Sequence, residues 1–440
     1  MILNHNKMIF PPLLSVYHNS STKGTPMNIL VINQKTFGYE DVISIFKSKG
    51  HHVSTYSHAN ISDHHNDEIF NDIQTLVQKE NISLVFSFNY YPIVSYVLKD
   101  TNVKYISHVY DSPNIAVFTC SIIFPCNYIF LFDYAVYEKL HNGGISTVFY
   151  LPLAVNVARM HSLIETSAHS IKTGNAKLAG SSGVPLAHLP KNSSFEHEVS
   201  FVGRLYNESH TLYDRLCAKF RPEHEYVHGY LNGIIDAQSH IYDYFFLEEM
   251  LDEKTLAILD ETYPYTPNND SIATPAYAYA HYFMARKVTE IERKRLLKKV
   301  SENFNLSLFT QQETPELPHA HNLGPIDYYD KMPLVFNKSK INLNITLKSI
   351  LTGIPLRCID IMASGGFLLT NYQADMFRHF EPGVHFDYYC SDEELLYKID
   401  YYLNHEDERM AICENAKKEI ERNFNLEDYL QMMLDVVEGK

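Results

Sequence analysis

The sequence predicts an α/β protein with two Rossmann-like domains, each built around a parallel sheet. Short apolar runs with the length of buried strands alternate with segments in which apolar residues recur at helical spacing. This alternation is typical of a parallel sheet covered by helices on both faces. It is interrupted near the middle of the chain by a segment of different composition, and 440 residues exceed what one core usually holds. We therefore expect two sheets whose carboxyl ends face each other across a cleft.

The first domain is expected at residues 27–156, after a disordered extension at 1–26. Residues 27–33, MNILVIN, form an apolar run that predicts a buried strand, and an amphipathic helix is expected at 39–49. No GxGxxG motif follows the first strand, so the dinucleotide fingerprint of dehydrogenases is missing. The remaining elements are expected as strands at 51–57, 83–88, 103–109, 128–132 and 146–151 and as helices at 67–80, 93–99 and 134–141.

The second domain is expected at residues 198–425. Residues 157–197 before it are expected to be a linker or flexible loop, because most of this segment is rich in Ser, Ala, Gly, Lys and Asn and lacks periodicity. A strand at 198–206 opens the domain, and a mainly helical insertion occupies about 211–300. Residues 426–440 are expected to form a closing helix.

Two capping boxes predict where helices begin in the second domain. Thr289 with Glu292 predicts the start of the last helix of the insertion, and Ser391 with Glu394 predicts the start of a later one. In each pair the hydroxyl would accept a bond from the backbone N–H three residues further on.

Residues 340–370 read as one unit that builds a ligand-binding corner. A strand gives way to a turn at Gly353, Pro355 opens a helix, and the helix stops at Gly365 and Gly366 before the next strand. The free N–H groups and the dipole at the start of such a helix favour an anion. The sequence therefore predicts a phosphate site near Gly353.

Composition argues against several classes of protein. The formal charge of −15, without a basic tract, argues against nucleic acid as a partner. No run approaches the roughly 20 apolar residues needed to span a membrane. The six cysteines are scattered without CxxC pairs, as in reduced thiols of the cytoplasm. We therefore expect a cytoplasmic protein, with peripheral association with a membrane left open, and the 23 histidines show no spacing that predicts a metal site.

Several motifs occur in an order and spacing that point to a known family. The second half contains VSFVGRLY (199–206), LGPIDYYDKMPLVFNKSKINLN (323–344), GIPLRCIDIMASGGFLLT (353–370), SDEELLYKIDYYL (391–403) and EDERMAICENAKK (406–418), and the first half contains FSFNYYPIVS (86–95), YISHVYDSPN (105–114) and FYLPLAVN (149–156). Together they resemble group 1 glycosyltransferases, specifically the branch of the spore-maturation CgeB-like proteins. The resemblance covers most of 27–155 and 198–425.

The resemblance implies the GT-B fold, with a nucleotide-diphosphate sugar held by the second domain and an acceptor held by the first. It implies transfer of the sugar to a hydroxyl of a glycan, lipid or protein, without a cofactor or an obligatory metal, and it leans towards retention of configuration. It also suggests that the closing helix at 426–440 crosses back to the first domain.

The resemblance assigns donor-binding roles to Asp360, Arg204 and the glycine beside Arg204, and the helix start adds Arg357 as a further candidate. Asp360 occupies the place of the helix carboxylate that accepts bonds from the ribose hydroxyls. Arg204, after Gly203, resembles the base that binds the diphosphate and neutralises its charge during departure. Arg357 lies in the first turn of the helix, where an anion would offset its unfavourable position. The alternatives are a solvated acid or a partner of Arg357 for Asp360, a surface salt bridge for Arg204, and a structural pair with Asp360 or Asp327 for Arg357.

Further donor contacts are expected from the same corner. Thr352 stands where many relatives carry a second glutamate that touches the donor sugar, and Gly353 follows it. Gly365 and Gly366 would let the backbone approach the ligand, although a helix C-cap explains one of them. Thr370 could line the sugar pocket, and Lys340 and Lys348 are weaker candidates for phosphate contact.

Acceptor-side residues are expected at the carboxyl ends of two strands of the first domain. His108 and Asp111 follow one strand, and either could deprotonate or orient an acceptor hydroxyl. A buried hydrogen-bonded histidine and an aspartate that caps a turn are the alternatives. Asn89 and Tyr90 follow the neighbouring strand and are expected to contact the acceptor.

Two other functions stay open from the sequence. Loss of the first family carboxylate at Thr352 is compatible with an inactive GT-B protein that serves as a structural or binding component of a surface or coat assembly. A nucleotide-sugar epimerase or hydrolase would share the same cleft between two domains.

Overall fold

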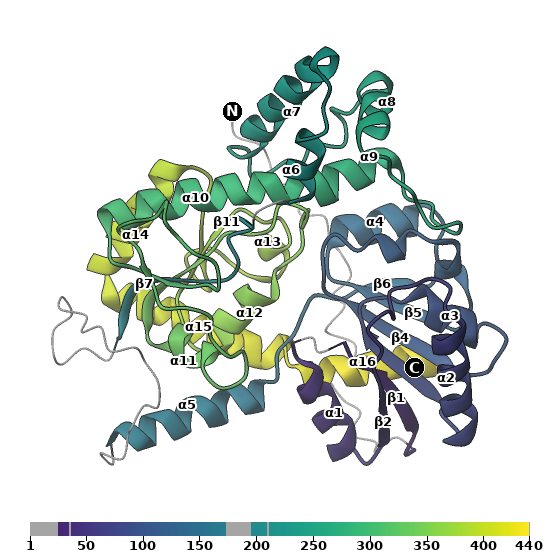
Figure 1. Cartoon of the computed structure of the whole chain (residues 1–440). Coiled ribbons are helices and arrows are strands. Elements are labelled where there is room, and N and C mark those ends of the chain that lie inside the picture. The colour runs from purple at the N-terminus through teal and green to yellow at the C-terminus, as the bar shows by residue number, and fades with distance from the viewer. Residues whose placement is uncertain (1–24, 35–36, 173–194, 209–210, 440) are drawn as a thin grey trace.

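The computed structural model contains two parallel sheets of six strands each, as the sequence predicted (Figure 1). It describes residues 25–34, 37–172, 195–208 and 211–439, so the extension expected at 1–26 lies almost wholly outside the described residues. The first sheet has the order β2-β1-β3-β4-β5-β6, with β1 Asn28–Ile32, β2 His52–Tyr56, β3 Leu84–Phe88, β4 Lys104–Val109, β5 Asn127–Leu131 and β6 Val148–Tyr150. Its helices are α1 Tyr39–Ser48, α2 Asp67–Lys79, α3 Pro92–Leu98 and α4 Tyr134–Asn142.

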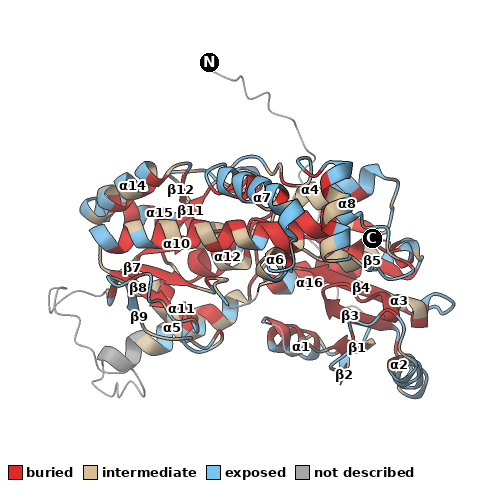
Figure 2. Cartoon of the chain, turned by 45° about the horizontal axis from the view of Figure 1, so that its top comes forward, coloured by how far each residue is buried: buried red, intermediate tan, exposed pale blue. Residues whose placement is uncertain are grey.

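The second sheet has the order β12-β11-β10-β7-β8-β9. Its strands are β7 His197–Val202, β8 Leu306–Phe309, β9 His321–Asn322, β10 Ser339–Asn344, β11 Leu368–Asn371 and β12 Asp387–Tyr389. Its helices are α11 Met332–Asn337, α12 Leu356–Ala363, α13 Met376–His379, α14 Asp392–Asn404 and α15 Glu406–Asn423. Buried residues concentrate in both sheets and in the helix faces turned towards them (Figure 2). The capping box at Ser391 is confirmed, because its side chain accepts a bond from the Glu394 N–H.

Two helices cross between the halves. The structure places α5 Val157–Lys172 where we expected a linker, and residues 173–194 lie outside the described part. The composition of the later residues hid a helical pattern in which Met160 is buried. At the other end, α16 Leu426–Glu438 returns along the first sheet (Figure 1) and shares an apolar cluster with its strands, and Glu427 pairs with Lys49 at 3.0 Å.

The insertion is helical, and its last helix, α10, runs across the upper part of Figure 1, below the other helices of the insertion. Its elements are α6 Leu212–Cys217, α7 Glu225–Gln238, α8 Glu253–Thr262, α9 Pro275–Ala278, a π-helical stretch at Tyr279–Met284, and α10 Ala285–Asn303. They enclose an apolar cluster of their own. The loop before α9 reaches the first half, where Asp270 contacts His64 at 2.7 Å.

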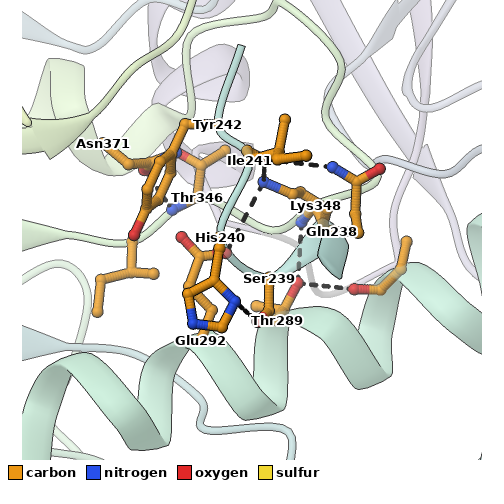
Figure 3. A network of polar contacts seen from close by, with 12 residues as sticks. Gln238, Ser239, His240, Ile241, Tyr242, Thr289, Glu292, Thr346, Lys348 and Asn371 are labelled. Carbon is orange, nitrogen blue, oxygen red and sulfur yellow. Dashed lines mark hydrogen bonds and ion pairs between the residues drawn. The ribbon is translucent and has the colours of Figure 1, made fainter. Parts of the chain in front are cut away.

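The helix start predicted at Thr289 is wrong, because α10 begins at Ala285 and continues directly from the π-helical stretch. Thr289 instead joins the insertion to the corner. Its hydroxyl donates to the Ala285 carbonyl and accepts a bond from the Lys348 N–H at 2.9 Å. The Lys348 ammonium donates to the Ile241 carbonyl at 2.7 Å and lies 4.0 Å from the buried Glu292 carboxylate (Figure 3).

A buried carboxylate joins the two halves of the protein. Asp133 caps α4 through the Ala135 N–H at 3.1 Å. It also accepts bonds from the Leu351 N–H at 2.6 Å, the Thr352 N–H at 3.2 Å and the Thr352 hydroxyl at 3.0 Å, all from the other half. We call this set the Asp133 contact. Burial raises the pKa of Asp133, and the four donated bonds oppose that rise.

A second carboxylate lies beside the Asp133 contact. Asp375 accepts a bond from the Tyr134 N–H at 3.1 Å, and its own N–H donates to the Thr352 carbonyl. Burial and the neighbouring Asp133 raise the pKa of Asp375 to about 7. Gly353 completes the fit, because a Cβ there would lie 2.8 Å from the Phe132 ring. Backbone and side chains are therefore closely matched where the halves meet.

Replacement of Asp133 by alanine should loosen the contact between the halves. The Leu351 and Thr352 N–H groups would lose their acceptor in a buried place, which typically costs about 1–3 kcal/mol of unfolding free energy. Hydrogen exchange at these two amides should accelerate. Asp252→Ala is the control, because Asp252 caps α8 through Thr255 in the same way but lies outside the contact. Equal exchange at Leu351 and Thr352 in both variants would contradict the assignment.

Candidate functional site

A cleft of about 820 Å³ opens between the two sheets. The first half contributes Phe37 and residues 110–113, which follow β4. The second half contributes the ends of β7 and β10 and the start of α12, and the insertion contributes His281, Tyr282, Arg286 and Arg293. The carboxyl ends of strands from both halves thus face one cavity, which is where α/β proteins bind ligands.

Four arginines line the cleft. They are Arg204 after β7, Arg286 and Arg293 on α10, and Arg357 on α12. Within the described residues, none of the four forms an ion pair with a carboxylate. A cavity with several cations and no paired acid attracts anionic groups, and guanidinium groups match phosphate oxygens in geometry.

Two of these arginines are fixed by the second half. Arg293 donates to the Ile345 carbonyl at 3.1 Å and to the Arg204 carbonyl, so it holds the ends of two strands. Arg357 donates to the Asn344 side chain at 3.2 Å. Burial lowers the pKa of Arg357 and lowers that of Arg293 to about 10. An anion in the cleft would offset the cost of burying both charges.

The other two arginines are more accessible. Arg204 and Arg286 are exposed, and the Arg286 guanidinium lies 4.9 Å from the centre of the Tyr206 ring. Gly203 has a φ of +152°, which side chains rarely adopt, and a Cβ there would lie 2.6 Å from the tip of the Arg357 side chain. The predicted pair Gly203 and Arg204 therefore lies at the cleft, with the glycine making room for Arg357.

Asp360 lies at the cleft, within the helix α12, and is 2 % exposed. The Tyr328 hydroxyl donates to it at 3.3 Å. Burial raises the pKa of Asp360 to about 7, against the opposing effect of Arg159. Asp360 forms no ion pair with Arg357 in the described structure. The Asp360 carboxylate and the guanidinium groups of Arg293 and Arg357 all line the cleft.

The other predicted donor contacts lie outside the lining of the cleft, and the structure gives each a structural role instead. Thr352 belongs to the Asp133 contact, and Gly353 packs against the Phe132 ring beside it. Gly365 ends α12 with a φ of +72°, and a Cβ at Gly366 would lie 2.7 Å from the Phe336 carbonyl oxygen. Thr370 is buried and accepts a bond from Asn344 at 2.9 Å. The phosphate site predicted near Gly353 stays a prediction for the start of α12, which lines the cleft, but the Leu351 and Thr352 N–H groups take no part in it because they bind the side chain of Asp133.

On the acceptor side, only Asp111 of the four predicted residues lines the cleft. His108 is buried, lies 3.4 Å from the Leu151 carbonyl oxygen and lines a separate small cavity. Burial lowers the pKa of His108 to about 4. Tyr90 is buried in the core, where its hydroxyl contacts Ser121 at 2.8 Å. Asn89 is buried too, and it contacts Asp111 rather than the cavity.

The side chains that the insertion contributes to the cleft were not predicted from the sequence. Arg286 and Arg293 are seven residues apart, which places them on the same face of α10, and both stack on Tyr206. Tyr282 accepts a bond from the Ile115 N–H at 2.7 Å and donates to the Pro113 carbonyl at 3.2 Å. The helical spacing of the arginines was visible in the sequence, but nothing in it indicated that this face meets the cleft.

Comparisons with solved structures identify the arrangement. A glycosyltransferase from Rickettsia africae ESF-5 superposes with a TM-score of 0.52 and 12 % identity, over 95 % of this chain and 100 % of that one. A sucrose-phosphate synthase from Thermosynechococcus elongatus gives 0.54 and 8 %, over 94 % and 98 %. The chain has the GT-B fold. Residues 287–435 also match the family model described as Glycosyl transferase-like, which covers α12, Arg293, Arg357 and Asp360.

The search of the curated proteins found no significant match to this chain. Within the described ranges, no helix is both long and apolar enough to cross a membrane. The similarity to known proteins therefore consists of the fold and the domain matched at residues 287–435.

Inorganic pyrophosphate provides a direct test of the arginine-lined cavity. In Arg286→Gln, loss of one charge-assisted contact should weaken pyrophosphate binding about tenfold, as measured by calorimetry at fixed ionic strength. Arg422→Gln removes an equal charge from an exposed position on α15 and should leave binding unchanged. Equal weakening in both variants would show that net charge, and not the cavity, attracts the anion.

Proposed function

We propose that the protein is a glycosyltransferase that moves a sugar from a nucleotide-diphosphate sugar to a hydroxyl of a glycan, lipid or protein acceptor. The observation that carries this proposal is the group of four arginines without ion-pair partners that faces a buried carboxylate in the cleft of a GT-B fold. The matched domain supports the reaction class. The motifs quoted above support placement in the CgeB-like branch.

The donor would lie against the second half. Asp360 would accept bonds from the ribose hydroxyls, since two vicinal hydroxyls match the two oxygens of a carboxylate. Arg204, Arg286 and Arg357 would bind the diphosphate, aided by the free N–H groups at the start of α12. As the bond between the anomeric carbon and the phosphate oxygen breaks, negative charge grows on the diphosphate, and these cations would stabilise it.

The acceptor would approach from the first half, where Asp111 lies at the cleft. Its carboxylate would accept a bond from a neighbouring group of the acceptor and so orient the attacking hydroxyl towards the anomeric carbon. The acceptor oxygen forms the new bond to the sugar as the diphosphate leaves. Under the retention that the resemblance implies, the proton of the acceptor hydroxyl passes to the departing phosphate oxygen. Asp111 then positions the hydroxyl and keeps its own charge.

A panel of nucleotide sugars, offered with and without cell-envelope extracts, tests the proposal through the release of nucleoside diphosphate. Release should depend on an acceptor and should fall at least tenfold in Asp360→Asn, whereas Asp400→Asn on the exposed side of α14 should behave as wild type. Because Asp360 has a raised pKa of about 7, its ionised form gains population between pH 6 and 8. Turnover at subsaturating donor should therefore rise over this range in the wild type and lose that rise in Asp360→Asn.

Other outcomes of the panel would replace the proposal. Binding without turnover on every donor would favour a structural or binding protein. An epimerised sugar formed without acceptor would identify an epimerase, and nucleotide release without acceptor would identify a hydrolase.

A further inference from the structure

Asn89 lies directly after β3 in a backbone conformation that few residues adopt. Its φ is +60°, in the left-handed region where asparagine is tolerated better than most side chains. Its N–H donates to the His108 carbonyl at 2.9 Å, and its carbonyl accepts a bond from the Ser87 hydroxyl. The backbone of Asn89 is thus tied to both neighbouring strand ends.

Both the oxygen and the nitrogen of the Asn89 side chain bond to the loop that carries Asp111. Its Oδ1 accepts bonds from the Tyr110 and Asp111 N–H groups, each at 3.1 Å. Its Nδ2 donates to the Asp111 carboxylate at 2.7 Å. The orientation of the amide is settled by the two backbone groups, because an N–H can only donate and so must face the amide oxygen. The NH₂ group therefore has to face Asp111.

The loop is held from two further directions. The Ser112 hydroxyl donates to the Ser349 carbonyl at 2.6 Å, and the Ser349 hydroxyl donates to the Ser112 carbonyl at 2.9 Å. Tyr282 of the insertion contacts residues 113 and 115 through its hydroxyl. Of these contacts, only that of Asn89 reaches the Asp111 carboxylate itself.

We propose that Asn89 is a positioning residue that aims the Asp111 carboxylate into the cleft. This inference rests on the proposed function for its effect on turnover, but not for its effect on Asp111. Desolvation raises the pKa of Asp111, and the bond from Asn89 lowers it. A hydrogen bond to the charged form of an acid stabilises that form, so the contact that orients the carboxylate also favours its charged form.

Asn89→Gly removes the side chain and keeps a residue that adopts positive φ without strain. Asn89→Asp keeps an oxygen towards the two N–H groups but places a second carboxylate against Asp111. The control is Asn81→Gly, since Asn81 has a φ of +50° in the turn before β3 and does not line the cleft. The pair of glycine variants separates the side-chain effect from that of backbone conformation.

The test is a carboxyl-carbon NMR titration of Asp111 in the full chain, assigned with Asp111→Asn, together with the pH profile of kcat and KM. The pKa of Asp111 should rise from wild type to Asn89→Gly and further in Asn89→Asp, and should be unchanged in Asn81→Gly. In Asn89→Gly, kcat should fall about tenfold with little change in the donor KM, and the acid limb of the profile should move to higher pH.

An unchanged Asp111 pKa in both Asn89 variants would overturn the inference, whatever the activity. A raised pKa with unaltered kcat and pH profile would also overturn it, since Asn89 would then control Asp111 without serving the reaction. If the wild type transfers no sugar, the proposed function fails, and the titration alone decides whether Asn89 holds the Asp111 charge. If Asn89→Gly does not fold, Asn89→Asp, which is nearly isosteric, supplies both readouts.

Discussion

The relation between the two halves depends on the Asp133 contact. A single carboxylate of the first half accepts three bonds from Leu351 and Thr352 of the second, in addition to the bond that caps α4. These two residues precede α12, which carries Arg357 and Asp360. Together with the bonds between Ser112 and Ser349, this interaction therefore helps to set the distance from the donor side of the cleft to Asp111. Because the carboxylate is buried, its bonds are strong and their loss is costly.

The Asp133 contact also explains why the chain has Thr352 in place of the glutamate that many relatives carry. Thr352 stands where many relatives have a glutamate, but its hydroxyl donates to Asp133 and accepts a bond from the Ala135 N–H. A glutamate in this place would bring a second negative charge against Asp133, beside Asp375. Thr352 is thus suited to joining the halves, and its identity says little about whether the cleft is active.

The sequence predicted the fold well, because buried parallel strands and amphipathic helices leave periodic patterns that do not depend on distant contacts. It predicted the corner at 340–370 from local punctuation, Arg204 and Asp360 by resemblance, Arg357 from its place in the first turn of a helix, and Asp111 from its position after a strand. All four line the cleft. The capping box at Thr289 failed because the π-helical stretch before α10 continues the helix, so that the pattern falls inside it.

What the sequence did not predict comes from contacts between distant segments. Arg286 and Arg293 reach the cleft because the insertion packs over it. The Lys348 ammonium bonds to the Ile241 carbonyl and lies near the Glu292 carboxylate, so it is not placed to bind a phosphate. The positions of His108 in β4 and of Tyr90 just after β3 were predicted correctly, but both side chains are buried in the protein. Such differences depend on tertiary packing, which local spacing does not contain.

The central claim is that the cleft binds a nucleotide diphosphate between the arginines and Asp360. A crystal structure of the protein with a bound nucleoside diphosphate tests it most directly. We predict that the diphosphate binds among Arg204, Arg286 and Arg357. The ribose hydroxyls should bond to Asp360, and the Asp133 contact should be intact. A nucleotide bound outside the cleft, or a diphosphate that touches none of these arginines, would contradict it.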